Sequence, residues 1–123
     1  MKNKASFSFK ARAASIRYAW QGLAAFFNEQ HNAIIHLGFT IAVLLAAVYL
    51  KIEGTELVAL LLATGFVWSA EIFNTAIEAV MDHLSPAKHP KVKFIKDVAA
   101  AAVLIAAITA AIVGLLIFIP KII

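Results

Sequence analysis

Four polar residues recur on one face of a predicted helix, and their side chains are of the types that bind cations or accept protons. They are Glu71, Asn74, Glu78 and Asp82. An α-helix turns by about 100° per residue, so offsets of 3, 7 and 11 residues return to within about 60° of the starting direction. The four side chains therefore share one face, which we call the polar stripe.

The polar stripe follows fourteen residues, Leu57 to Ala70, that contain no charge. A carboxylate near the centre of a bilayer costs about 3 kcal/mol on insertion scales. Ionisable groups in such helices therefore usually face a protein interior or a watery cavity, where they hold protons or metal ions. We expect the chemistry of this protein at the polar stripe.

The types of these side chains favour one reaction. Oxygen ligands suit Mg²⁺, which commonly takes one or two carboxylates together with substrate phosphates. Nearby lysines suit phosphate, and a glutamate can act as a general base toward a hydroxyl group. Transfer of a phosphoryl group from MgATP to a lipid alcohol needs ligands for Mg²⁺, positive charge near the phosphates and a general base, since positioning and charge neutralisation dominate that reaction. No GxxxxGK[ST] nucleotide loop accompanies them.

The composition predicts a membrane protein with a single domain. Of the 123 residues, 63% are hydrophobic and 15% are charged, whereas soluble proteins are about 45–50% apolar. Because the chain contains no cysteine, disulfides, a thiol nucleophile and a thiolate metal site are excluded. The net charge of +4 is better explained by membrane orientation than by binding to nucleic acid.

Three transmembrane spans are predicted, over residues 34–50, 57–81 and 98–119, the last ending at Pro120. A turn at residues 51–56 joins the first two spans, and a connector at 82–96, broken by Pro86 and Pro90, joins the last two. Residues 7–27 alternate basic and apolar groups and predict an amphipathic helix on the membrane surface, anchored by Tyr18 and Trp20. The predicted fold class is all-α, with one surface helix and three spans in one domain over residues 1–123.

The distribution of lysine and arginine predicts the orientation of the spans. The N-terminal segment carries five of these residues and the second connector carries four, whereas the turn at 51–56 and the C-terminal tail carry one each. Positive charge collects on the cytoplasmic side of membrane proteins. The N-terminus and the second connector are therefore expected inside the cell, in the inner (cytoplasmic) membrane.

The polar side chains of all three spans are expected near the cytoplasmic boundary. At 1.5 Å per residue, Glu71 lies about 21 Å from the outer end of the second span, and Glu78 lies about 10 Å further. Glu29 precedes the first span on the inner side, and Lys96 and Asp97 mark the inner end of the third. This arrangement suits a reaction between a cytosolic reactant and a membrane-borne one better than it suits ion conduction.

The polar stripe resembles the signature of a known family. Residues 71–82 read EIFNTAIEAVMD and resemble the pattern E-[IL]-x-N-[ST]-A-[IV]-E-x-x-x-D of the small bacterial integral-membrane diacylglycerol kinases and undecaprenol kinases. The segments YAWQG at 18–22, Asn28-Glu29 and HPKVKFIKDVAA at 89–100 are also similar to family segments. The resemblance extends from about Phe7 to Lys121, and the connector and C-terminal end look closer to the undecaprenol kinase branch.

The resemblance implies roles for individual residues. Glu71 matches the family's catalytic base, which activates the lipid hydroxyl group, and Glu29 and Glu78 match the ligands of the ATP-bound Mg²⁺. The remaining matches are positions near the nucleotide and substrate: Tyr18, Asn74, Glu78, Asp82, Lys96 and Asp97. The family is homotrimeric, with each site shared between subunits, and its lipid substrate is either diacylglycerol or undecaprenol.

Two alternatives to a kinase stay open on the residues alone. A small proton-coupled transporter would use Glu71 as its titrating carboxylate and would not consume ATP. A non-catalytic assembly subunit would rely on the small residues Ala102, Ala106, Ala110 and Gly114, which let membrane helices approach closely. In that case substitution of the glutamates would leave function intact.

Overall fold

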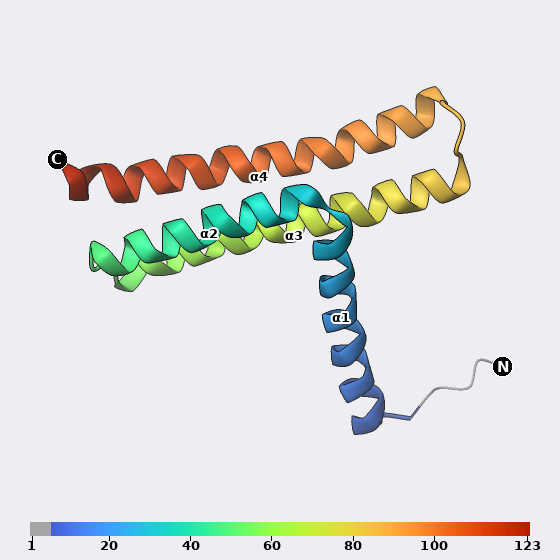
Figure 1. Ribbon diagram of the computed structural model, residues 1–123, viewed down its shortest axis with the longest axis horizontal. Helices are drawn as coiled ribbons and strands as arrows, with labels where there is room; N and C mark the ends of the chain where they lie inside the picture. The colour runs from blue at the N-terminus through green and yellow to red at the C-terminus, as the bar shows by residue number, and fades with distance from the viewer. Residues whose placement is uncertain (1–5) are drawn as a thin grey trace. The chain divides into compact units, whose positions relative to one another are not determined.

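The computed structural model describes residues 6–123, and in that range the regular structure consists of four helices (Figure 1). They are α1 (Phe9–Glu29), α2 (His31–Tyr49), α3 (Gly54–Leu84) and α4 (Pro90–Ile122). The last three are long and apolar enough to cross a membrane. The predicted all-α membrane fold is therefore confirmed. Lys2 and Lys4, which contribute to the predicted orientation, lie outside the described residues.

The helices extend beyond the apolar stretches from which the spans were predicted. The connector between α3 and α4 shortens to residues 85–89, because α3 continues to Leu84 and α4 begins at Pro90. Similarly, α4 continues through Pro120 to Ile122 instead of ending at the proline. Apolar content marks the length that fits a bilayer, whereas a helix continues for as long as its backbone hydrogen bonds can form.

Side-chain caps explain where two of the helices begin. The hydroxyl oxygen of Ser8 accepts a hydrogen bond from the Ala11 amide, 3.3 Å away, at the start of α1. At the start of α4, His89 Nδ1 accepts from the Lys91 amide at 3.1 Å. Pro90 follows His89 at the first helical position, where its missing N–H group costs nothing. The local sequence thus places the entrance of α4 at His89.

The contacts within the chain divide it into two compact units, one up to Gly38 and one from Phe39 onward. In the first unit, α1 exposes most of its surface and buries only Phe26. Its two arginines lie over aromatic rings, with the Arg17 guanidinium 5.4 Å from the centre of the Tyr18 ring. This combination fits the predicted surface helix, and its location at a membrane surface stays a prediction.

In the second unit, α3 and α4 pack side by side in opposite directions (Figure 1). Small residues let the two helices approach, since Ala63 of α3 and Ala99 and Ala106 of α4 are buried. Of the predicted ladder of small residues, Ala106 is fully buried but Ala102 is exposed. Steps of four residues drift around a helix by about 40° each, so one such row cannot face a single neighbour throughout.

A small hydrophobic core closes the end of the second unit that lies away from the α3–α4 connector. It contains Ala47, Ile52, Leu60 and Ile117. Close to it, Lys121 Nζ lies 3.3 Å from Glu56 Oε2 and joins the end of α4 to the start of α3. The polar stripe lies toward the opposite end of α3, away from this core.

Candidate functional site

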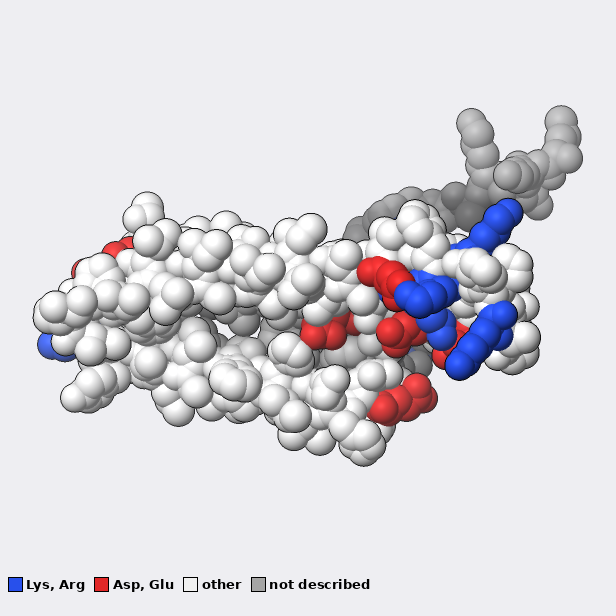
Figure 2. Space-filling model, turned by 90° about the horizontal axis from the view of Figure 1, so that it is seen from above, with Lys and Arg blue, Asp and Glu red and all other residues white. Residues whose placement is uncertain are grey.

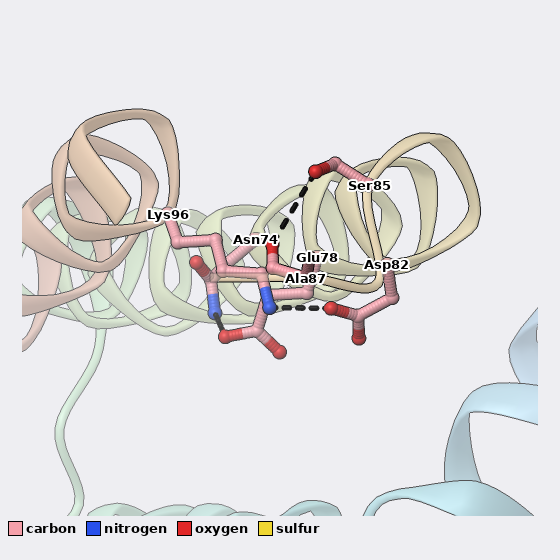
Figure 3. Close-up of polar contacts among 6 residues, drawn as sticks. All are labelled: Asn74, Glu78, Asp82, Ser85, Ala87 and Lys96. Carbon is pink, nitrogen blue, oxygen red and sulfur yellow. Dashed lines mark hydrogen bonds and ion pairs between the residues drawn. The ribbon is translucent and has the colours of Figure 1, made fainter. Parts of the chain in front are cut away.

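The polar stripe lies on the second half of α3. Glu71, Asn74 and Glu78 are half-buried, and Asp82 is exposed. Asn74 Nδ2 donates a long hydrogen bond of 3.4 Å to Glu78 Oε1, one helical turn away (Figure 3). The helix therefore brings an amide and a carboxylate together, as the spacing of the residues predicts.

The side-chain oxygen of Asn74 is buried and has no hydrogen-bond partner among the described residues. Leaving a buried acceptor unsatisfied costs about 1–3 kcal/mol. A hydrogen-bond donor or a cation would satisfy this oxygen, and the neighbouring Glu78 carboxylate supplies further oxygen atoms. The Asn74 and Glu78 oxygens are suitable ligands for Mg²⁺, which prefers oxygen ligands.

An ion pair joins α4 to the polar stripe. Lys96 extends from α4 toward α3, where its ammonium group pairs with Asp82 Oδ1 (Figure 3). The Lys96 side chain is 34% exposed and that of Asp82 is 66% exposed, so the attraction is weakened by solvent and contributes little to stability. Its main effect is to hold a positive charge beside the polar stripe.

Asp97 points to a different partner. It pairs with Lys93, four residues earlier on α4, and both side chains are largely exposed. A pair at this spacing on a helix surface contributes about 0.2–0.5 kcal/mol. The structure therefore joins Lys96 to Asp82 and Asp97 to Lys93, and it records no ion pair between Asp97 and the polar stripe in the part of the chain it describes.

A cavity of about 650 Å³ opens at the α3–α4 connector. Its wall combines the end of α3, the connector and the first turns of α4, and it includes both ion pairs. The lining residues that carry charge or can donate hydrogen bonds are Asp82, Ser85, Lys88, His89, Lys93, Lys96 and Asp97. On α3 and α4, charged side chains gather toward this end, and a long uncharged surface separates them from the few at the other end (Figure 2).

Three residues that line this cavity are not among the site residues predicted from the sequence. Lys88, Lys93 and His89 line the cavity beside Lys96. The Lys93–Asp97 spacing of four residues is the signal in the sequence that favours their pairing. The presence of Lys88 and His89 in the cavity wall has no comparable signal in the sequence.

Two predicted site residues belong to the first unit. Glu29 is the last residue of α1 and is exposed, and Tyr18 is 61% exposed beside Arg17. Within residues 6–123, no three histidine, aspartate or glutamate side chains form a group that could hold a metal ion. Joint binding of Mg²⁺ by Glu29 and Glu78 therefore stays a prediction.

Comparisons with known proteins identify similar chains. The family described as prokaryotic diacylglycerol kinase matches residues 17–118. A diacylglycerol kinase of Synechocystis sp. is 41% identical over 107 residues, which is 86% of this chain but only 61% of that relative's length. An undecaprenol kinase of Bacillus subtilis is 35% identical over 107 residues, which is 87% of each chain. A diacylglycerol kinase of Escherichia coli is 38% identical over 96 residues, covering 77% of this chain and 78% of the relative.

Proposed function

Because the chain belongs to the prokaryotic diacylglycerol kinase family, we propose that it transfers the γ-phosphoryl group of ATP to the hydroxyl group of a membrane lipid. The relatives are named for two lipids, diacylglycerol and undecaprenol. Both lipids are hydrophobic alcohols that would reach the site from the membrane, whereas ATP would reach it from the cytosol. The products would be a lipid phosphate and ADP.

In this reaction the hydroxyl oxygen of the lipid attacks the γ-phosphorus. A new P–O bond forms as the bond between the γ-phosphorus and the oxygen bridging it to the β-phosphate breaks. Glu71 takes the hydroxyl proton, because it is the carboxylate of the polar stripe nearest the uncharged half of α3, from which a lipid would approach. ADP leaves with the electron pair of the broken bond.

Mg²⁺ would be held by Glu78 and Glu29, with Asn74 assisting, and when bound it neutralises charge on the phosphates of ATP. The buried oxygen of Asn74 supports this assignment, since it lacks a donor among the described residues. Lys96 would offset phosphate charge, with Asp82 orienting its ammonium group. Asp97 and Tyr18 would complete the nucleotide side of the site.

The proposed setting is the bacterial inner membrane, with the N-terminus and the α3–α4 connector facing the cytoplasm. The four lysines within residues 82–96 support this orientation. We also propose a homotrimer with shared sites, in which apolar surfaces left exposed by the single chain, such as Leu104 and Ile108 of α4, face lipid or another copy. No nucleic acid partner is proposed.

The observation that carries the proposal is the polar stripe, in which oxygen ligands at the end of an uncharged span lie beside a lysine held by α4. The test uses purified protein, labelled ATP, and diacylglycerol and undecaprenol offered separately, with and without EDTA. We expect one lipid to acquire label, and we expect chelation of Mg²⁺ to abolish the transfer. Absence of label on both lipids, in protein that is folded and self-associated, would refute the kinase assignment.

Lys96→Met should weaken the use of ATP. The substitution keeps a long side chain but removes the charge that pairs with Asp82. We expect the KM for ATP to rise about tenfold, corresponding to about 1.4 kcal/mol of lost interaction with phosphate. Initial rates at varied ATP and saturating lipid measure this effect.

Lys91→Met is the matched control, because Lys91 lies on the same helix, is exposed, and does not line the cavity. Equal ATP KM values for the two variants would contradict the role of Lys96.

A further inference from the structure

A hydrogen bond joins α2 to α3 just before the polar stripe. Trp68 Nε1 donates to Thr40 Oγ1 at 3.0 Å, between two half-buried side chains that are 28 residues apart in the sequence. Both residues belong to the second unit. A tryptophan N–H group in an apolar span needs an acceptor, because hydrocarbon offers none.

The position of this bond along α3 relates it to the polar stripe. The hydrophobic core around Leu60 anchors α3 near its start, and Trp68 lies about 12 Å further along the helix at 1.5 Å per residue. Glu71 follows Trp68 after only about 4.5 Å and on the same face. The bond therefore ties α3 to α2 about one turn before the proposed base, in addition to the packing of α3 on α4.

Together with the packing on α4, this tie restricts how far α3 can rotate about its own axis. A carboxylate held about 6 Å from the helix axis moves by about 1 Å when the helix turns by 10°. A misplacement of 1 Å can cost about a hundredfold in rate when reacting groups must be aligned. The rotational setting of α3 at this point thus decides where the Glu71 carboxylate meets a hydroxyl group.

We propose that Trp68 and Thr40 are positioning residues for lipid phosphorylation, which set the place of Glu71 through the α2–α3 hydrogen bond. This inference rests on the proposed kinase function. Trp68 lies on the uncharged side of Glu71, and Asn74, Glu78 and Lys96 lie on the other side toward the connector cavity. Loss of the bond should consequently impair the step that uses the lipid hydroxyl and should spare the binding of ATP.

The test compares variants that remove one partner of the bond at a time. Thr40→Val replaces the hydroxyl with a methyl group, and Trp68→Phe keeps an aromatic ring but removes the N–H group. We expect each to lower kcat about tenfold and to leave the KM for ATP within about twofold of the unaltered protein. The double variant should be no slower than the slower single variant, because both substitutions remove the same bond.

Two further variants separate positioning from general packing. Thr40→Ser keeps the acceptor and should restore most of the rate. Thr64→Val is the matched control, because Thr64 lies on α3, the helix of Trp68, and donates its hydroxyl group to Leu60 of that same helix at 2.8 Å. The rate of this variant should be unchanged.

Three outcomes would overturn the inference: an unchanged rate for Thr40→Val, an equal loss for Thr40→Ser, or a rise in the KM for ATP that accounts for the loss. A lack of lipid kinase activity in the unaltered protein and in Thr64→Val would instead contradict the proposed function. If Trp68→Phe fails to fold, the Thr40 series still decides, because the valine and serine variants differ from threonine by few atoms.

Discussion

Glu71→Gln should abolish lipid phosphorylation while leaving the protein folded and self-associated. The amide has nearly the same shape as the carboxylate but cannot accept the proton of the lipid hydroxyl. General base catalysis typically contributes about 10²–10⁴-fold, so we expect turnover to fall about a thousandfold. The measurement is initial transfer of label from ATP to the lipid, with size-exclusion chromatography and thermal unfolding of the same samples.

Glu56→Gln provides the control on the same helix. Glu56 lies in the first turn of α3, and its partner Lys121 is 3.3 Å away at the end of α4. Both side chains are partly exposed, and such pairs contribute about 0–1 kcal/mol to stability. We expect nearly normal turnover from Glu56→Gln. Near-normal turnover from Glu71→Gln would exclude Glu71 as the base.

The same experiment separates the kinase from the transporter that the sequence also allows. A transporter that titrates Glu71 would move its substrate in response to a proton gradient and would transfer no label from ATP. Family membership and relatives named as lipid kinases confirm the enzyme class predicted from the resemblance. The assignment of Glu71 as the base stays a proposal, which rests on the resemblance of residues 71–82 to the family signature and on the position of Glu71 in the polar stripe.

Most of the fold could be predicted from the sequence, because its signals are local. Uncharged stretches long enough to cross a bilayer predict the three long helices, and helical periodicity places Asn74 beside Glu78. The helix ends were less accurate. The start of α4 depends on His89 and Pro90 acting together as a cap, whereas the spans were predicted from apolar content alone.

The contacts between helices could not be predicted in the same way. The Lys96–Asp82 pair and the Trp68–Thr40 bond join residues that are 14 and 28 positions apart. Whether such residues meet depends on the rotation of each helix about its axis, which buried alanines such as Ala99 and Ala106 help to set. No short motif encodes that rotation, so these contacts become visible only in the folded chain.

Asn74→Leu should raise the stability of the protein and at the same time remove its activity. The buried oxygen of Asn74 has no hydrogen-bond partner among the described residues, and an unsatisfied acceptor of this kind costs about 1–3 kcal/mol. Leucine has a similar size, lacks polar atoms and is a better helix former than asparagine. The hydrogen bond that would be lost, from Asn74 to Glu78, is long at 3.4 Å and therefore weak.

We expect the free energy of unfolding of this variant to rise by about 1 kcal/mol, measured as an increase in Tm under identical lipid conditions. Lipid phosphorylation should fall at least about a hundredfold, if the oxygen helps to hold the Mg²⁺ that neutralises phosphate charge. Asn32→Leu is the matched control, because Asn32 is exposed in the first turn of α2 and its removal relieves no buried polar atom.

The two effects of Asn74→Leu are informative because they have opposite signs. If Asn74 only supported packing, its replacement would lower the stability and the activity of the protein together. A buried oxygen without a hydrogen-bond partner destabilises the folded protein, and binding of a cation would offset that loss of stability. A fall in Tm would indicate that the Asn74 amide supports the fold, and unchanged turnover would remove Asn74 from the site.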